Sequence, residues 1–274
     1  MEEKSKLCTT ESKKVIFFDI DGTLHCPTVG IPLSAKEGIR KLKENGHLVF
    51  ICTGRTKAML FNELEDMGFD GIIAGAGTYV EYEKEVLYRY DLDEETARSI
   101  ATDFRARDII PVPEGHDIFY LEDERNWSPE YKYVYEKYYS NVGGRIEKMP
   151  ADDKGIKCAK MSGVMHKASD IEKAKAAYEE DYLVVLHGNV IIELIPKGFS
   201  KAEGIKRMLD KLGIRRENTY AFGDSMNDYE MLEYVQYGVA MGNSDERLLS
   251  VAAYVADTVE NDGIYKALEH YGLI

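Results

Sequence analysis

The sequence predicts an α/β protein with a Rossmann-like parallel-sheet core, and two observations carry this prediction. Short, continuous apolar runs alternate with amphipathic segments from Val15 onward, a pattern typical of parallel strands that helices cover on both faces. Polar residues follow the ends of several of these runs, where parallel sheets bind their ligands. A chain of 274 residues is long enough for one large domain or for two of ordinary size.

The first part of the chain alternates strands with helices. The runs VIFFD, HLVFICTG and DGIIAG predict three strands. The segments 35–46 and 56–68 predict the two helices between them. Each helix ends at a glycine, Gly46 or Gly68, which suits the left-handed conformation that commonly terminates a helix.

The pattern changes near Tyr79 and indicates an insertion. TYVEYEKEVLYRY alternates like an antiparallel hairpin. A helix at 93–106, a tyrosine-rich stretch, a strand at 159–165 and a helix at 169–178 follow it. These elements predict a separate α+β unit of ordinary domain size.

The alternation of strands and helices returns at Val190. The segments that carry it are VIIELI, AEGIKRMLDKLG, TYAFGDS, MNDYEMLEYV, YGVAMG and a last helix near 264–271. We therefore expect a discontinuous core with an insertion. The expected parts are a flexible tail at 1–14, a core at 15–83 and 188–274, and an inserted domain at 84–187.

The composition excludes several classes of partner. Acidic residues outnumber basic ones by 49 to 35, and the formal net charge of -14 repels nucleic acids and anionic membranes. The four cysteines form no CxxC pair, which indicates reduced thiols. No apolar run reaches the roughly 18 residues of a membrane span. We expect a cytoplasmic protein with no nucleic-acid or membrane partner, either a monomer or a weak homodimer.

Polar groups after four predicted core strands carry the candidate chemistry. They are Asp19 and Asp21 after VIFF, Thr53 with Gly54 and Arg55 after LVFIC, Lys201 after VIIELIPKGFS, and Asp224 with Asn227 and Asp228 after TYAFG. In a parallel sheet these groups converge at one edge, where each carboxylate raises the cost of ionising its neighbours. A hard divalent cation offsets this repulsion, and oxygen ligands select Mg²⁺. The ionised Asp19 is then free to act as a nucleophile.

These motifs in combination resemble those of a known family. DIDGTL, the later TGR, the lone Lys201 and GDSMND resemble the four motifs of the haloacid dehalogenase (HAD) superfamily of phosphohydrolases. The insertion between the second and third motifs resembles the Cof-type branch with its large class IIB cap. Most members of that branch are phosphatases of sugar phosphates and other small phosphate esters. The resemblance covers nearly the whole chain from Val15 onward, and it implies a Mg²⁺-dependent phosphatase that acts on a small phosphorylated metabolite.

The resemblance implies a role for each motif residue. Asp19 attacks phosphorus and forms an aspartyl-phosphate, and Asp21 protonates the leaving alcohol and then takes a proton from water. Thr53 binds a phosphate oxygen, and Lys201 balances the charge of nucleophile and phosphate. The implied metal ligands are Asp19, Asp21 through its backbone carbonyl, and Asp224, with Asp228 in support. The expected substrate-binding residues are Gly22, Gly54, Arg55 and Asn227.

Several of these residues also fit simpler interpretations. Thr53 and Arg55 suit a strand end followed by a helix cap, and Asp228 suits the first turn of a helix, where it favours the dipole. Lys197 is an alternative to Lys201, although Lys201 opens a helix directly after its strand. The tyrosines of the insertion suit either core packing or contact with a sugar ring.

One stretch departs from the family pattern, and two other functions stay open. Many Cof-type sequences have Asn-Gly-Ala after the third strand, whereas this chain has Ala76-Gly77-Thr78, so substrate preference transfers poorly. A phosphomutase of sugar phosphates is the enzymatic alternative. A non-catalytic phospho-aspartate switch or phosphosugar sensor is the other, but Asp21 argues against a switch because a second acid that activates water shortens the life of an acyl phosphate.

Overall fold

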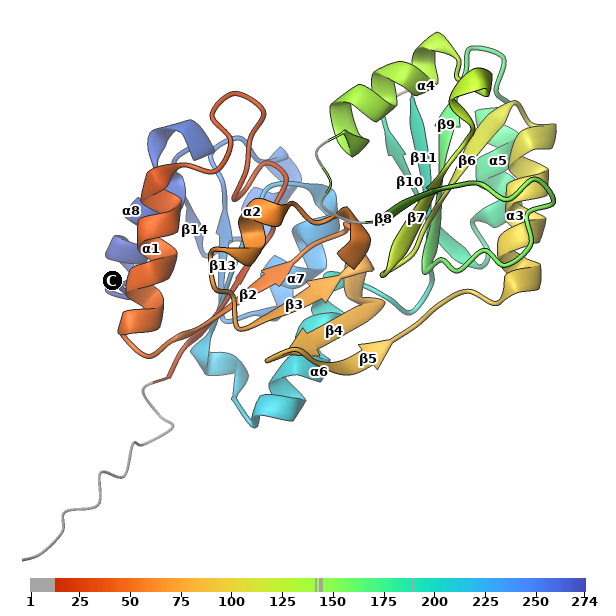
Figure 1. The fold of residues 1–274 in the computed structure, drawn as a ribbon. Helices are drawn as coiled ribbons and strands as arrows, with labels where there is room; N and C mark the ends of the chain where they lie inside the picture. The colour runs from red at the N-terminus through yellow and green to blue at the C-terminus, as the bar shows by residue number, and fades with distance from the viewer. Residues whose placement is uncertain (1–12, 141, 143–144, 189) are drawn as a thin grey trace, which may run out of the picture. The chain divides into compact units, whose positions relative to one another are not determined.

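The computed structural model describes residues 13–140, 142, 145–188 and 190–274 (Figure 1), so the predicted tail lies almost entirely outside the described residues. The chain divides into two compact units. Unit 1 comprises Met1–Ile51 and Ile205–Ile274, and unit 2 comprises Cys52–Gly204. These bounds differ from those of the predicted core and cap, and that division stays a prediction.

Unit 1 contains a parallel sheet in the order β14-β13-β12-β1-β2. Its strands are β1 (Val15–Phe18), β2 (Leu48–Cys52, of which the last residue belongs to unit 2), β12 (Thr219–Gly223), β13 (Tyr237–Ala240) and β14 (Tyr254–Val255). Every residue of β1, β2 and β12 is buried. The continuous apolar runs of the sequence are therefore parallel strands, as predicted.

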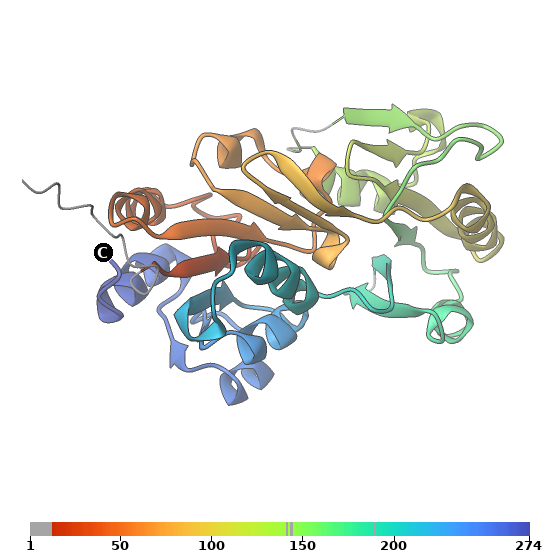
Figure 2. The same cartoon turned by 90° about the horizontal axis from the view of Figure 1, so that it is seen from below.

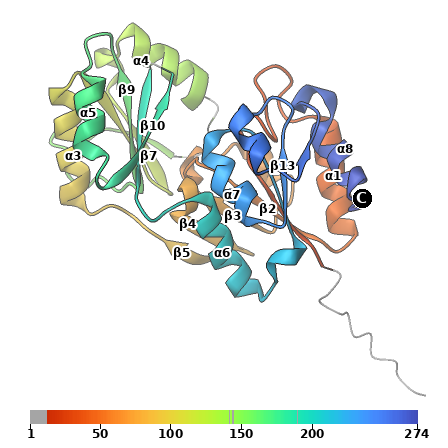
Figure 3. The ribbon, with the colours of Figure 1, turned by 180° about the vertical axis from the view of Figure 1, so that it is seen from behind.

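Helices cover both faces of this parallel sheet. They are α1 (Leu33–Glu44), α7 (Tyr229–Tyr234), α8 (Gly263–His270) and α6 (Lys201–Leu212), which begins in unit 2. Figure 2 shows α1 beside α8, and the two helices are in contact. The β1-α1-β2 and β12-α7-β13 crossovers step across the sheet in opposite directions, so right-handed connections place α1 and α7 on opposite faces. Accordingly, α1 lies in front of the strands in Figure 1 and α7 does so in Figure 3.

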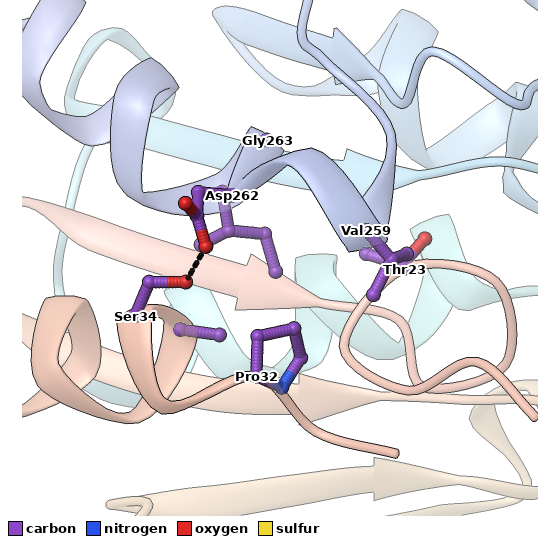
Figure 4. Close-up of a pocket in the computed structure, with 8 residues that line it drawn as sticks. Thr23, Pro32, Ser34, Val259, Asp262 and Gly263 are labelled. Carbon is purple, nitrogen blue, oxygen red and sulfur yellow. Dashed lines mark hydrogen bonds between the residues drawn. The ribbon is translucent and has the colours of Figure 1, made fainter. Parts of the chain in front are cut away.

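Short 3₁₀ helices complete unit 1, and a small cavity lies beside one of them. The 3₁₀ helices are η5 (Arg216–Asn218), η6 (Met226–Asp228), η7 (Glu246–Ser250) and η8 (Val259–Asn261). The cavity is too small to hold a water molecule, and it lies among Thr23, Pro32 and Val259 (Figure 4). Beside it, Ser34 Oγ donates a hydrogen bond to Asp262 Oδ1 at 2.5 Å, which fixes the start of α1 against the residue that precedes α8.

Unit 2 begins with a small antiparallel meander. Strands β3 (Gly71–Ala74), β4 (Tyr79–Tyr82) and β5 (Glu85–Arg89) pair in chain order, and the 3₁₀ turn η2 (Gly75–Gly77) joins the first two. The β4-β5 hairpin is the one that the sequence predicts. Its two turn residues, Glu83 and Lys84, both have positive φ angles, 48° and 68°, as a type I′ turn requires.

The helix predicted at 56–68 is wrong over most of its length. Only η1 (Lys57–Met59) and α2 (Asn62–Glu65) form, and the two residues between them are extended. Ala58 and Met59 pack against the six-stranded sheet described next. These tertiary contacts outweigh the helical periodicity of the segment.

The rest of unit 2 is a six-stranded sheet in the order β10-β11-β9-β6-β7-β8. Its strands are β6 (Ile109–Glu114), β7 (Ile118–Leu121), β8 (Arg145–Lys148), β9 (Lys160–Met165), β10 (Tyr182–His187) and β11 (Ile191–Pro196). Figures 1 and 3 show helices on both faces. Helices α3 (Glu94–Ala106) and α5 (Ile171–Tyr178) cover one face, and α4 (Pro129–Val134) with the π-helical turn η4 (Tyr135–Tyr139) covers the other. The short turn η3 (Glu124–Asn126) precedes α4.

The prediction that the parallel alternation resumes at Val190 is wrong for its first strand. β11 lies in the six-stranded sheet and is antiparallel to both of its neighbours, β10 and β9. The cause is β10, an unpredicted, partly exposed strand that pairs along its whole length with β11. The parallel strands resume with β12.

The described cysteines and helices agree with the composition. Cys26, Cys52 and Cys158 are buried and form no disulfide, and Cys8 lies outside the described residues. Among the described residues, no helix combines the length and the apolar character that a membrane span needs.

Candidate active site

Three predicted metal ligands come together in unit 1. Asp19, Asp224 and Asp228, here called the acidic cluster, each have a carboxylate oxygen within 4.8 Å of those of the other two. Asp19 is only 3% exposed and Asp228 is fully buried. Three carboxylates this close repel one another strongly when ionised. A bound cation is the simplest way to keep them charged in this place.

The parallel strands β1 and β12 create this meeting point. Phe18 pairs with Phe222 in the parallel register, and the backbone N–H of Asp19 donates to the Phe222 carbonyl at 3.0 Å. Because β1 and β12 are parallel, both strands end at the same edge of the sheet. Asp19 and Asp224 follow the two strand ends directly, so the backbone sets their proximity.

Gly22 brings the backbone of the first motif against the acidic cluster. It has a φ of +87°, and a Cβ atom at this position would lie 2.2 Å from Asp224 Oδ2. Its N–H donates to the His25 carbonyl at 2.8 Å and closes the turn. Only glycine permits both the left-handed conformation and this close approach.

Two residues that we did not predict as site residues hold this arrangement. Thr23 Oγ1 donates to Asp224 Oδ1 at 2.9 Å, and Asn243 Nδ2 donates to the Gly22 carbonyl at 3.0 Å. Thr23 belongs to the DGT motif, which could have identified it. Asn243 lies in the loop after β13, and nothing in the sequence near it indicates a site.

Asp228 organises the loop that carries Asp224. Its Oδ2 atom accepts hydrogen bonds from the backbone N–H groups of Asp224, at 3.0 Å, and Ser225, at 3.1 Å. Gly223 makes room for it, because a Cβ there would lie 2.5 Å from the Asp228 carboxyl carbon. Asp228 also completes a capping box with Ser225. Asp228 therefore has the expected role at the start of a helix, and it also belongs to the acidic cluster.

The other two motif residues of unit 1 are exposed. Asp21 lies on the surface and forms a backbone bridge with His25, so it is open to a leaving group or to water. Asn227 is also exposed, and its Oδ1 atom accepts a hydrogen bond from Ser225 Oγ at 2.7 Å.

In unit 2, the structure brings the end of β2 close to the start of α6. Thr53 and Lys201 are each only 1% exposed, and the Sγ atom of Cys52 lies 3.8 Å from the Lys201 carbonyl oxygen. The alternative lysine, Lys197, is exposed. A lysine is seldom buried unless its charge has a partner, and a bound anion would provide one. The burial of Lys201 at the start of a helix therefore favours Lys201 over Lys197 as the site residue.

Two glycines allow this close packing. A Cβ on Gly77 would lie 2.3 Å from the Ser200 carbonyl oxygen, and one on Gly204 would lie 2.3 Å from Ile73 Cγ2. The turn after β3 therefore packs directly on the first turn of α6. Ala76, which departs from the family pattern, has a left-handed conformation with φ 54° and ψ 39°, the region in which asparagine is favoured over alanine.

The loop after β2 is held by its own hydrogen bonds. The Thr53 N–H donates to the Ile73 carbonyl at 2.9 Å, and Thr53 Oγ1 accepts from the Arg55 N–H at 3.1 Å. Gly54 between them is partly exposed. The Arg55 guanidinium donates to the Met59 carbonyl at 3.3 Å and lies 4.5 Å from the centre of the Phe61 ring.

Comparisons with known proteins identify the class of this chain. The family model of haloacid dehalogenase-like hydrolases matches residues 16–268. The chain therefore belongs to this family, as its motifs predicted. The structural comparisons agree, since one of the similar solved structures is that of a HAD subclass IIB protein.

Individual relatives add detail. "Putative phosphatase YkrA" of Bacillus subtilis (strain 168) is 33% identical over 95% of this chain and 98% of its own length. "5-amino-6-(5-phospho-D-ribitylamino)uracil phosphatase YitU" of the same organism is 26% identical over 94% of this chain and 97% of its own. The HAD subclass IIB sugar phosphatase BT4131 has 27% sequence identity and a TM-score of 0.81, over 95% of this chain and 100% of its own. The predicted enzyme class agrees with these findings.

Proposed function

We propose that the protein is a Mg²⁺-dependent phosphatase of small phosphate monoesters, sugar phosphates above all, which acts through an aspartyl-phosphate on Asp19. The acidic cluster is the observation that carries this proposal. Its donors are carboxylate oxygens, Gly22 packs its backbone against them, and such oxygen donors suit Mg²⁺. The names of YitU and BT4131, which specify a ribityl phosphate and a sugar phosphatase, support the substrate class.

The residues of the acidic cluster would hold the ion. Asp19 and Asp224 are the proposed direct ligands, together with the Asp21 backbone carbonyl, and Asp228 supports them by fixing the Asp224 loop. When bound, the ion offsets the charge of the phosphate and its carboxylate neighbours.

Each remaining motif residue has a proposed task in the reaction. Asp19 attacks phosphorus, while the exposed Asp21 carboxylic acid donates its proton to the departing alkoxide and later accepts a proton from the attacking water. The Thr53 hydroxyl and the Lys201 ammonium bind oxygens of the transferred group, where charge spreads in the transition state.

Several finer points belong to the same proposal. Gly22 and Gly54 offer backbone N–H groups, and Arg55 and Asn227 offer side chains, to the bound ester. We also propose a cytoplasmic location, which the buried reduced cysteines support, and a monomer or weak homodimer that acts on a small phosphorylated metabolite.

Phosphate release from a panel of sugar phosphates, nucleotides and p-nitrophenyl phosphate tests this function. We expect Mg²⁺-dependent release of inorganic phosphate, and Asp19→Asn should abolish it while the melting temperature stays near that of the unaltered protein. Asp66→Asn, at an exposed carboxylate, is the matched control and should keep full activity. An isomeric sugar phosphate in place of free phosphate would establish the mutase instead, and undiminished turnover by Asp19→Asn would remove the proposed nucleophile.

A further inference from the structure

One edge of the six-stranded sheet is unprotected. β10 is the last strand of this sheet, and among the described residues it pairs with β11 alone. Its sequence, YLVVLH, contains no proline and no acidic residue, lysine or arginine. Leu183 and Leu186 are 52% and 41% exposed. A long apolar edge strand of this kind readily pairs with a strand of another molecule.

The other edge strands of the described sheets differ from β10. β14 has only two residues. β5 carries Glu85 and Arg89, and β8 carries Glu147 and Lys148. Short length and charged side chains are the usual protection against pairing between molecules. Among these edge strands β10 alone lacks both, which indicates that its edge, here called the β10 edge, has a partner.

The register of β10 shows which of its backbone groups point outward. The N–H of Lys197 donates to the Asp181 carbonyl at 3.0 Å, so Asp181 and every second residue after it turn their backbone groups toward β11. The residues between them turn theirs the other way, and these are Tyr182, Val184 and Leu186. No strand in the described part of the chain lies there to bind these groups. A strand from another molecule would satisfy them.

A second copy of β10 fits the β10 edge. If the two strands run antiparallel about a twofold axis at Val184, this residue lies opposite the partner's Val184, and Tyr182 lies opposite the partner's Leu186. All three outward-facing residues then form hydrogen-bonded pairs, with about six hydrogen bonds in total. The side chains of these pairs are apolar on both strands and lie on the same face of the sheet.

The same alignment is also complementary in charge. Leu183 lies opposite the partner's Val185, and Asp181, which precedes β10, lies opposite the partner's His187. Asp181 and His187 are both exposed. The hydrogen bond with Glu193 raises the pKa of His187, which favours its cationic form. Each end of the paired strands therefore brings an acidic side chain to a basic one.

Neighbouring alignments lose this match. A shift of the axis to Leu183 places Asp181 opposite the partner's Val185, and a shift to Val185 places His187 opposite the partner's Leu183. An ionised side chain then faces an apolar one. An unrelated apolar peptide would bind the backbone groups, but it would not supply the two charged residues in their places. The β10 edge is therefore more complementary to itself than to such a peptide.

We propose that the β10 edge pairs with the β10 edge of a second copy of this chain, in an antiparallel arrangement about a twofold axis at Val184. The six-stranded sheets of two copies then form one continuous sheet. A pairing along one strand buries less than the roughly 1,200 Å² of the smaller stable interfaces, and the net charge of -14 opposes association. We therefore expect a weak dimer with a dissociation constant on the order of 10–100 μM. This pairing does not depend on the phosphatase reaction.

Sedimentation velocity of the full chain, over roughly 1–500 μM protein, measures this association. We expect a reversible monomer–dimer equilibrium for the unaltered protein. Leu186→Lys places a charge opposite the partner's Tyr182, at both ends of the paired strands, and should raise the dissociation constant at least about 10-fold. The matched control is Ile146→Lys on the opposite edge strand, β8, where Ile146 is 42% exposed. It should leave the dissociation constant unchanged.

Val184→Pro tests the backbone part of the pairing. Proline removes the N–H of Val184, which points away from β11, so the pairing of β10 with β11 keeps its hydrogen bonds. The central hydrogen bonds of the dimer are lost. The dissociation constant should therefore again rise at least about 10-fold.

Either of two results would overturn this pairing. One is a protein that stays monomeric up to about 500 μM. The other is a dimer that Leu186→Lys and Val184→Pro, both folded by thermal melting, leave as stable as before. If Val184→Pro does not fold, Leu186→Lys decides alone, and equal weakening by Ile146→Lys would contradict a contact through β10. Phosphate release is measured separately on the unaltered protein, and its absence refutes the proposed function but leaves the dimer standing.

Discussion

Replacement of Gly22 by alanine tests the geometry of the acidic cluster. A Cβ on Gly22 would lie 2.2 Å from Asp224 Oδ2, and the residue has a φ of +87°. Gly30 provides a matched control, because it lies nearby in the chain and has a φ of +66°, but a Cβ there would meet nothing within 4 Å. Both variants suffer the same kind of backbone strain, and only Gly22→Ala disturbs Asp224.

The structure gives the size of each effect. A left-handed alanine costs about 1–2 kcal/mol, which lowers the melting temperature of either variant by about 2–4 °C per kcal/mol. Gly22→Ala must also displace the Asp224 carboxylate, which Thr23 Oγ1 holds at 2.9 Å, by about 1 Å to reach an ordinary contact distance. Because metal sites tolerate only about 0.2 Å, we expect the Mg²⁺ concentration for half-maximal activity to rise about 10- to 100-fold.

Two measurements decide this prediction. Mg²⁺ titrations of p-nitrophenyl phosphate hydrolysis should show the rise for Gly22→Ala and none for Gly30→Ala. Stabilisation against thermal unfolding by Mg²⁺ should follow the same order, since binding to the folded state raises the melting temperature. Equal Mg²⁺ dependence of the two variants would refute the close approach of Gly22 to Asp224, the proposed metal ligand.

Three further predictions concern stability. Asp228→Ala leaves two partly buried backbone N–H groups without their acceptor, so denaturant unfolding should show a loss of about 2–4 kcal/mol; a loss below about 1 kcal/mol would contradict the role of Asp228 in the loop. Ala76→Gly relieves a left-handed alanine and should gain about 1 kcal/mol, whereas Ala97→Gly inside α3 should lose about as much; a loss in both would show that position 76 is not strained. Burial lowers the pKa of His116 to about 4, below about 6.5 in the unfolded chain. Its neutral form therefore stabilises the fold above pH 6.5, and this contribution is lost as the pH falls toward 4. From pH 7.5 to 5 the unaltered protein should lose about 2 kcal/mol more than His116→Gln, and parallel stability curves would exclude this origin.

The sequence was sufficient to predict the acidic cluster because parallel topology fixes where strand ends lie. Asp19 and Asp224 follow strands that pair directly. The continuous apolar runs before the two residues predicted these strands, and therefore predicted that both carboxylates lie at the same edge of the sheet. Asn243 was not predicted, because its hydrogen bond to the Gly22 carbonyl depends on a loop that is distant from Gly22 in the sequence. A lone side-chain amide in a loop has no local pattern that reveals such a contact.

Antiparallel strands of the six-stranded sheet were harder to predict than the parallel ones. β6 contains Pro111 and Pro113, which usually argue against an interior strand. The structure accommodates them because β6 pairs with β9 along its whole length, whereas it pairs with β7 only through Glu114 and Phe119. The buried ion pair between Lys160 and Glu193 was equally hard to predict, because the two residues are distant in the sequence and meet only through the strand order.

The phosphoryl group on Asp19 is the central claim of this account, and chemical trapping tests it most directly. The protein is mixed with Mg²⁺ and saturating p-nitrophenyl phosphate, quenched, and treated with borohydride, which reduces an acyl phosphate to an alcohol. Mass spectrometry of the peptides should find homoserine at position 19 and at no other aspartate. Phosphate release without any reduced residue 19, or with reduction at another carboxylate, would contradict the account.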